Sequence, residues 1–535
     1  MNNNNAAINN VNAENKINSN TDSNANTNVK SSPNILKVLI DMLKQYGLLL
    51  GTDVKEEDVK KLNIDIIISK LAEMKAKDPA MFIVTKDHIN KIIEENNKKE
   101  VLEVKVIRSA EFKPIAAEVD AVYSIESKTI QRAEGNVNDF IRYFNSRLDR
   151  MRKILSGHKD CSDCLKNIES LKGLAAGRDV CIVGIVTTKI ITKKGNIMLV
   201  VEDSTGEAKI IFMNGTSDAS KKLYKSASNI INDEVVAIKG KYSDPFIMAN
   251  SIIWPDIPIK DKKQIDADLA IAFVSDIHVG SKVFLENNFY HMLEWLNGRL
   301  DFEKELAGKI KYMVVGGDVA DGIGVYPNQE KDLAVMDEYE QYKRLFELLE
   351  LIPDYIQIFV LPGNHDSVQR AEPQPPFSGD IVKDFKRPNI HLISNPSYLT
   401  FNGVEVLTYH GTSLDSMIKE IPGLSYSKPE EVMVELLKRR HLSPIYGGNV
   451  IVPTKDDNLV IDKVPDILHM GHIHKNGLSN YHKVHIINSG TWQDRTEFQI
   501  KQGHIPTPAL LPVYEMKYDK FTNVNFMKIE NSAKF

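Results

Sequence analysis

Hydrophobic residues form three different patterns along the chain, and each pattern predicts a different kind of domain. Between residues 33 and 97, apolar residues recur three and four positions apart, which is the spacing of one face of a helix. Gly47 is placed to end a first helix, a second starts near Asp65, and Thr85 can cap a third. We therefore expect a small helical module over residues 33–97.

Short runs rich in β-branched residues dominate residues 177–256. The runs span 180–191, 197–202, 208–212, 234–241 and 246–253, with a helical candidate at 219–228. Five strands with a helix between the third and the fourth are typical of an oligonucleotide/oligosaccharide-binding barrel, or OB-fold. Lys189, Lys193 and Lys194 make the first hairpin basic, but the barrel has few aromatic residues on which bases could stack. Contact with single-stranded nucleic acid and a role in packing or assembly both stay open.

Apolar strands alternate with amphipathic helices from residue 266 to residue 535. We expect strands at 269–274, 312–315, 356–361, 404–409, 466–470 and 484–487, and helices at 286–300, 331–351 and 429–440. This alternation predicts an α/β domain in which helices cover the sheets. The fold class is therefore multidomain, with a helical module, a barrel and a C-terminal α/β domain.

Residues 98–176 are expected to be a linker with one amphipathic helix over 139–155. The helix has an apolar stripe, and it also carries the basic residues Arg142, Arg147, Arg150, Arg152 and Lys153. We interpret it as a helix that packs on the body of the protein and keeps a basic face in solvent. Contact with nucleic acid is the alternative.

Composition limits the class of protein. Asn fills thirteen of the first thirty positions, so we expect residues 1–32 to be a disordered tail. A net charge of −5 over 535 residues argues against a protein that coats nucleic acid by bulk charge. Neither a run of about 18 apolar residues nor a signal peptide is present, so we expect no membrane partner.

The chain has 3 Cys, too few for a disulfide framework, and we expect a reducing, cytoplasmic location. Cys161 and Cys164, near His158, could be half of a zinc site. No second Cys/His pair follows at finger spacing, so we expect two thiols.

Residue types that bind metal ions follow almost every predicted strand of the C-terminal domain. In chain order they are Asp276, His278, Asp318, Asn364, His365, Asp366, His410, His472 and His474. Strand ends in an open α/β sheet meet at one edge, so side chains far apart in sequence can form one cluster. Oxygen and imidazole donors without thiolates suit Mn²⁺, Fe or Zn²⁺, and a bridging carboxylate would allow two ions.

These residues occur in motifs that resemble the complete motif set of calcineurin-like metallophosphoesterases. The motifs are Asp276-Ile277-His278, Gly317-Asp318, Gly363-Asn364-His365-Asp366, His410-Gly411 and Gly471-His472-Ile473-His474. The resemblance implies that Asp276, His278 and His474 bind one metal ion. It implies that Asn364, His410 and His472 bind the other, and that Asp318 bridges the two. We expect two divalent cations, with Mn²⁺ preferred and Fe, Zn²⁺ or Mg²⁺ as alternatives.

Two further residues have chemical roles to assign. The resemblance implies that His365 acts on the leaving group. We interpret His365, oriented by Asp366, as the general acid. Asp321 either supports a metal ligand or is a turn residue before Gly322, and both interpretations stay open.

The neighbouring residues give a narrower resemblance. Over about residues 135–535, the chain is similar to the small subunits of archaeal family D DNA polymerase. The segments that carry this similarity are Gly317-Asp318-Val319-Ala320-Asp321-Gly322, Tyr409-His410-Gly411-Thr412-Ser413 and Asn488-Ser489-Gly490-Thr491-Trp492-Gln493. The resemblance implies a metal-dependent 3′ to 5′ exonuclease that proofreads for a separate large polymerase subunit, with that subunit and DNA as partners.

Two other functions need to be weighed against the exonuclease. An inactive assembly subunit would not need the intact ligand set, and a phosphatase would not need the barrel. Residues 341–346 loosely resemble a sliding-clamp peptide, but they lie in a periodic helix and should be buried. We therefore expect contact with a sliding clamp only through the polymerase complex.

Overall fold

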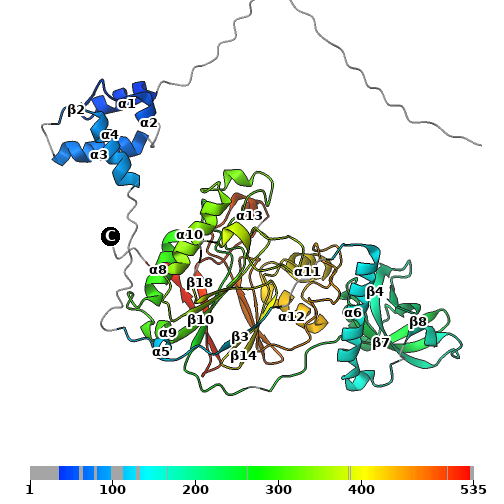
Figure 1. The fold of residues 1–535 in the computed structure, drawn as a ribbon. Helices are drawn as coiled ribbons and strands as arrows, with labels where there is room; N and C mark the ends of the chain where they lie inside the picture. Colours follow the sequence, from blue (N-terminus) through cyan, green and yellow to red (C-terminus); the bar gives the residue numbers. More distant parts are fainter. Residues whose placement is uncertain are drawn as a thin grey trace, which may run out of the picture. The chain divides into compact units, whose positions relative to one another are not determined.

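The computed structural model describes residues 35–59, 64–77, 81–97, 112–127, 133–164, 167–261, 263–383, 385, 387–502 and 504–529. The Asn-rich segment 1–32 and residues 98–111 of the expected linker lie outside the described residues. The chain divides into two compact units, residues 1–105 and 106–535 (Figure 1). None of the described helices is long and apolar enough to cross a membrane.

The first unit is the expected helical module. It contains α1 (Ile35–Lys44), α2 (Glu56–Val59), α3 (Ile64–Lys77) and α4 (Lys86–Asn97), and β1 (Leu49–Leu50) pairs in parallel with β2 (Ile83–Val84). Leu39, Leu71 and Ile89 are fully buried in its core. The three predicted helices are confirmed, whereas the four-residue α2 and the two-residue strands are too short to give a periodic signal.

A closed five-stranded barrel lies in the second unit, in the order β4-β5-β6-β8-β7. The elements are β4 (Asp179–Ile191), β5 (Ile197–Asp203), β6 (Gly206–Phe212), α7 (Asp218–Ser228), β7 (Val235–Ser243) and β8 (Phe246–Ile253). All five predicted strands and the intervening helix are present. Lys189 of the basic first hairpin is partly buried, because its ammonium group donates hydrogen bonds to the carbonyls of Ser228, the last residue of α7, and of Ile230.

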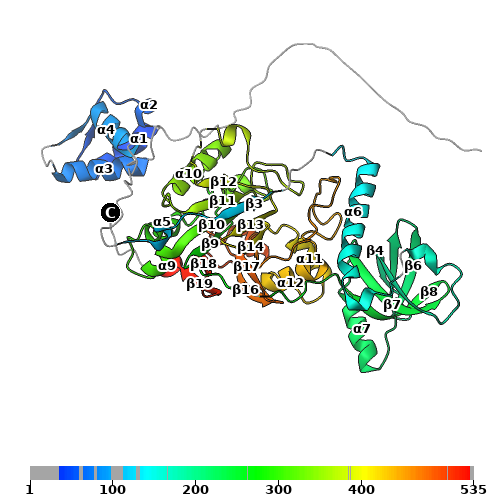
Figure 2. The same ribbon diagram turned by 60° about the horizontal axis from the view of Figure 1, so that its bottom comes forward.

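Two six-stranded sheets form the rest of the second unit (Figure 2). The first sheet has the order β12 (Ile390–Leu392), β11 (Gln357–Leu361), β10 (Ile310–Gly316), β9 (Ala270–Val274), β18 (Leu510–Glu515) and β19 (Lys520–Asn525). The second has the order β16 (Asn476–Tyr481), β17 (Val484–Ser489), β15 (Ile467–Met470), β14 (Val404–Thr408), β13 (Ser397–Phe401) and β3 (Tyr123–Glu126).

The two sheets pack face to face, and helices cover their outer faces. Alternate residues of a strand point to opposite faces, so Ile467 of β15 joins the core shared with the first sheet. Its neighbour Leu468 joins the core under α11 (Leu414–Glu420) and α12 (Pro429–Arg439). On the first sheet, residues of α8 (Glu286–Leu296) and α10 (Glu338–Glu350) are buried in the shared core cluster.

Some predicted boundaries were wrong. The segment expected to be a linker contributes α5 (Ile115–Glu118), next to α9 (Lys304–Lys309), and the edge strand β3. The helix predicted from residue 331 begins only at Glu338, because the Asp337 carboxylate caps it by accepting the N–H groups of Tyr339 and Glu340. The helix predicted to reach residue 300 ends at Leu296.

The amphipathic helix is α6 (Val137–Ser156), and its basic face does not lie free in solvent. Arg147 is buried and donates from Nε to Asp457 at 2.7 Å. Arg150 forms an ion pair with Asp462, and Arg152 forms one with Asp203. The helix therefore packs on the rest of the protein as predicted. Several of its basic side chains form ion pairs with the barrel and with the α/β domain.

Candidate metal centre

The predicted metal-binding residues lie on loops that follow β9, β10, β11, β14 and β15, and they converge at one edge of the two sheets. Five of them have backbone φ angles in the left-handed region, between +49° and +68°; they are Asp276, His278, Asp318, His472 and His474. Residues other than glycine seldom adopt this conformation, and it is concentrated at functional sites.

Among the described residues of this region, three groups of side chains have donor atoms within 4.8 Å of one another. The first group is Asp276, His278 and His474, the second is Asp318, His410 and His472, and the third is His278, Asp321 and His365. In the second group, Nε2 of His410 lies 3.0 Å from Oδ1 of Asn364. The first group has the same members as the set that the resemblance implied for one ion. The second group contains His410 and His472 of the other implied set together with Asp318, the implied bridge.

Asp318 lies between the first and second groups. Its Oδ2 is 3.2 Å from Nε2 of His410 and 4.0 Å from Nε2 of His278. One carboxylate is thus within reach of both groups, as a bridging ligand needs to be.

Two glycines of the motifs allow the backbone to approach these carboxylates. A Cβ atom on Gly363 would lie 2.2 Å from Oδ1 of Asp318, and one on Gly471 would lie 2.3 Å from Oδ2 of Asp276. Real contacts are never that short, so a side chain at either position would displace the neighbouring carboxylate.

Further side chains hold the imidazole rings in place. Nδ1 of His278 donates to Asp321 at 2.8 Å, and Nδ1 of His410 donates to the carbonyl of Gly316 at 2.8 Å. Asp321 therefore contacts one of the predicted ligands, which favours a supporting role over that of a turn residue alone. Such contacts fix the ring orientation and make the other nitrogen a better ligand.

Two supporting residues could not be identified from the sequence. Nε2 of His472 lies 3.2 Å from the carboxylate of Asp415, and the side-chain amide of Gln499 lies 2.8 Å from Nδ1 of His474. Asp415 follows His410 by five residues, which is the only signal that could have indicated it. Gln499 has none.

His365 and Asp366 lie at the centre, but the expected pairing between them was wrong. Nδ1 of His365 donates to the carbonyl of Asp321 at 2.8 Å. The Asp366 carboxylate instead accepts N–H groups of Gly363 and Ala320 and the hydroxyl of Tyr342. Asp366 thus ties the loop after β10 to the loop after β11 and positions both.

The buried carboxylates favour positive charge in this region. Burial alone would raise the pKa of Asp318, but the charges of His410 and His365 hold that pKa well below its usual value. Burial alone would lower the pKa of His410, but Asp318 raises it to about 10. A proton on His410 therefore balances Asp318, whereas burial lowers the pKa of His365 and of His474. Divalent cations would displace such a proton. The oxygen and imidazole donors of the centre therefore fit divalent cations.

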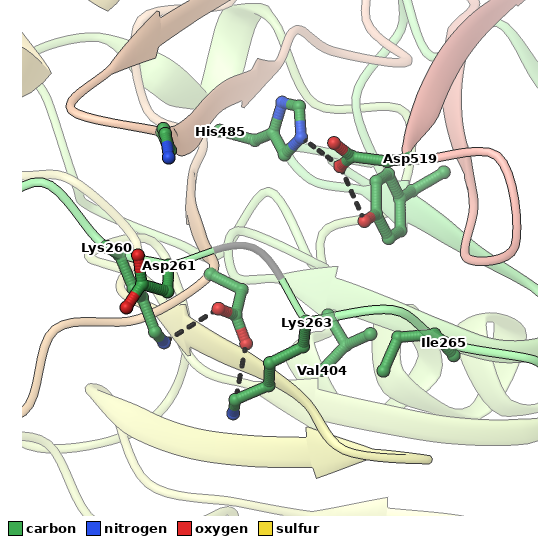
Figure 3. Close-up of a pocket in the computed structure, with 10 residues that line it drawn as sticks. Lys260, Asp261, Lys263, Ile265, Val404, His485 and Asp519 are labelled. Carbon is green, nitrogen blue, oxygen red and sulfur yellow. Dashed lines mark hydrogen bonds and ion pairs between the residues drawn. The ribbon is translucent and has the colours of Figure 1, made fainter.

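A small pocket lined by ion-paired side chains does not include any of the predicted metal-binding residues (Figure 3). Lys260 and Lys263 form ion pairs with Asp466, and His485 contacts Asp519. The cavity is about 30 Å³. It has room for a water molecule and not for a nucleotide.

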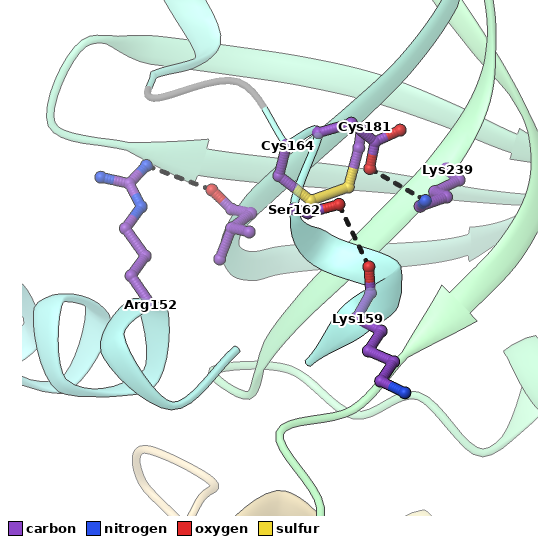
Figure 4. The surroundings of a disulfide bond; sticks show 8 residues. Arg152, Lys159, Ser162, Cys164, Cys181 and Lys239 are labelled. Carbon is purple, nitrogen blue, oxygen red and sulfur yellow. Dashed lines mark hydrogen bonds and ion pairs between the residues drawn. A yellow bond between two sulfur atoms is a disulfide. The ribbon is translucent and has the colours of Figure 1, made fainter. Parts of the chain in front are cut away.

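The cysteines do not form the two thiols that we expected. Cys164 is joined by a disulfide bond to Cys181 of β4, while Cys161 is a buried free thiol (Figure 4). Asp163 lies beside the pair and forms an ion pair with Lys239 at 2.9 Å. The prediction failed because the sequence does not show that β4 brings Cys181 back to the turn that follows α6.

The residues that resemble a sliding-clamp peptide are buried in α10. Gln341 is fully buried, and its side chain accepts the N–H of Gly322. Phe346 packs in the core of the first sheet. This segment is a structural part of the α/β domain and is not available as a docking peptide.

Comparison with known proteins places this centre in a family context. Residues 271–476 match the model of the DNA polymerase alpha/epsilon B-subunit family. The DNA polymerase II small subunit of Archaeoglobus fulgidus is 43% identical over 384 residues, covering 71% of this chain and 76% of that protein. The DNA polymerase II small subunit of Methanothermobacter thermautotrophicus is 39% identical, covering 75% of this chain and 82% of that protein. A solved structure titled as a novel archaeal phosphodiesterase is 14% identical over 48% of this chain and 99% of its own, with a TM-score of 0.23.

Proposed function

The chain belongs to the family of archaeal DNA polymerase II small subunits, and on that premise we propose that it is a metal-dependent 3′ to 5′ exonuclease. A small subunit of a heterodimeric polymerase implies a large-subunit partner. In this proposal the small subunit removes mispaired nucleotides from single-stranded or frayed ends of the DNA that the large subunit extends. It acts as the proofreading subunit.

The observation that carries the proposal is the convergence of a full ligand set around Asp318. A subunit used only for assembly would gain nothing from buried carboxylates and strained backbone at these positions, since each such feature costs stability. We interpret the two sheets as a calcineurin-like metallophosphoesterase domain. Asp276, His278 and His474 would hold one cation, Asn364, His410 and His472 the other, and Asp318 both.

The bound cations would supply a hydroxide nucleophile and neutralise charge on the phosphoryl oxygens. The side chains have complementary tasks. Because Nδ1 of His365 donates to the Asp321 carbonyl, its Nε2 is the atom that can face a substrate. We assign this atom to proton donation to the departing sugar oxygen. Asp366 is a positioning residue, because its contacts are to backbone and to Tyr342.

We interpret the barrel as an OB-fold that contacts DNA, the large subunit or both. Its strand order and closure support this assignment. A phosphatase that acts on proteins or small molecules would have no evident use for such a barrel.

One experiment separates the proposal from its rivals. The purified full chain is incubated with Mn²⁺ and an oligonucleotide labelled at its 5′ end, with an EDTA control. We expect a ladder that shortens from the 3′ end and releases mononucleotides, faster when the 3′ end is mispaired. Internal cuts would indicate an endonuclease, and hydrolysis of phosphomonoesters alone would indicate a phosphatase. A complete absence of hydrolysis would favour the assembly subunit.

A further inference from the structure

We propose that a cleft beside the metal centre binds the single DNA strand that leads to the scissile bond, with Arg370 on a phosphate and Tyr446 under a base. This inference rests on the proposed function and extends it to residues that the motifs do not include.

The cleft joins the metal centre to the barrel. It has a volume of about 690 Å³. Among its lining residues are Asn364, a proposed ligand, and Asp415, which holds His472. Asn232 and Asp233, from the loop that precedes β7 of the barrel, also line it, together with residues 445–450. A strand with its 3′ end at the ligands could therefore continue toward the barrel.

Three of the four acidic side chains that line the cleft have protein partners, namely Asp233, Glu372 and Asp415, whereas Glu420 is exposed beside Lys419 at its rim. Glu372 is buried and accepts hydrogen bonds from Tyr409 and Asn449. Asp233 accepts the N–H of Tyr446 at 2.9 Å. These hydrogen bonds reduce the repulsion that a phosphate would otherwise meet.

Arg370 is exposed, and its guanidinium group can bind an anion. Its Nη2 makes a long hydrogen bond of 3.4 Å to the carbonyl of Gly324. A guanidinium has five N–H donors in a planar fork that matches a phosphate, so most of its donor capacity faces the cleft region or solvent. Arg370 follows the ligand Asn364 by only six residues on the same loop.

Tyr446 adds an exposed aromatic surface next to a barrel that has few of them. Its side chain is 50% exposed. Phe140 and Phe144 of α6 hold the ring through edge contacts, with centroids 5.6 and 5.5 Å away. An aromatic ring fixed in this way and open to solvent is a platform for a base without sequence preference.

The test compares a long substrate with a short one. The full chain with Mn²⁺ is assayed on a 20-nucleotide strand and on the p-nitrophenyl ester of thymidine 5′-monophosphate, which is too short to reach Tyr446. We expect Tyr446→Ala to raise KM for the oligonucleotide on the order of 5- to 150-fold, the range for loss of one stacked base. Arg370→Ala should raise it about 10-fold or more. Both variants should hydrolyse the ester at about the wild-type rate, and Tyr446→Phe should keep the wild-type KM.

Matched controls lie on exposed surface outside the cleft. Tyr518→Ala removes a ring that is 56% exposed in the turn between β18 and β19, and Lys383→Ala removes an exposed cation. Neither should change KM. Fluorescence anisotropy of a labelled oligonucleotide, without Mn²⁺, measures binding independently of hydrolysis.

The outcomes separate the two proposals. If Tyr446→Ala and Arg370→Ala both leave the KM for the oligonucleotide and the anisotropy unchanged, the proposal that the cleft binds the strand is overturned. An equal loss on the ester would also overturn it, because the residues would then serve the metal centre. If the wild type binds the oligonucleotide through Tyr446 but hydrolyses neither substrate, the proposed exonuclease activity is wrong, whereas the proposed binding of a single strand in the cleft is supported.

Discussion

Removal of the Arg147 guanidinium should be among the most destabilising single changes outside the metal centre. Arg147 lies on α6, and its Nε donates to the carboxylate of Asp457 at 2.7 Å. Its Nη1 donates to the carbonyls of Asp233, at 3.0 Å, and Pro444, at 2.8 Å. One side chain thus joins α6, the barrel and a loop of the α/β domain.

The expected loss follows from burial. Arg147 is 2% exposed and Asp457 is fully buried, so Arg147→Ala leaves a buried carboxylate without its main counter-charge. Loss of one partner of a buried ion pair costs about 3–5 kcal/mol. His441, whose Nε2 lies 2.8 Å from Asp457, would compensate only in part: burial is the largest cause that lowers its pKa to about 4, although loss of the Arg147 charge, the second cause, would raise that pKa.

The assay is urea-induced unfolding followed by circular dichroism and tryptophan fluorescence. Arg142→Ala is the matched control, since Arg142 is 61% exposed and, within the described residues, forms its ion pair with Asp139 on the same helix. The control substitution should lower the free energy of unfolding by less than about 1 kcal/mol. If Arg147→Ala costs no more than Arg142→Ala, the junction does not depend on this buried pair and the reasoning is wrong.

Three further predictions concern the centre and the cysteines. His365→Ala should retain bound Mn²⁺ by calorimetry but lose about 10²- to 10⁴-fold in turnover; loss of metal instead would make it a ligand. Substitution of His472 and His474 by Ala together should eliminate hydrolysis and leave co-purification with the large subunit intact, because a stable interface needs on the order of 1,200–2,000 Å² elsewhere on the surface. Loss of the partner by a folded double variant would place the metal centre in the interface. Cys164 and Cys181 should resist maleimide labelling until a reductant is added, so that one thiol per chain reacts in the denatured, unreduced protein and three react after reduction. Three reactive thiols without reductant would contradict the disulfide.

The sequence predicted those features that a local residue pattern encodes, namely the metal-ligand residue types at strand ends and the strands of the barrel. Metal-ligand residues at strand ends predicted one cluster, because parallel strands deliver their carboxyl ends to one edge of a sheet. The five strands of the barrel were predictable because each is a compact run of β-branched residues bounded by turn residues.

The remaining elements depend on contacts that no local pattern encodes. β3 pairs with β13, which lies about 270 positions later, so nothing near Tyr123 indicates a strand. Asp366 follows His365 directly, yet neighbouring side chains point in different directions and their partners differ. The contact of Gln499 with His474 likewise exists only after folding.

Manganese stoichiometry and hydrolysis, measured on the same preparation, test the two-metal centre most directly. Isothermal titration should give two Mn²⁺ ions per wild-type chain. Asp318→Ala should bind fewer ions and hydrolyse no oligonucleotide, whereas Asp380→Ala, an exposed carboxylate outside the centre, should match the wild type. A folded Asp318→Ala chain with near wild-type hydrolysis, or a wild-type chain that binds no Mn²⁺, would contradict the account.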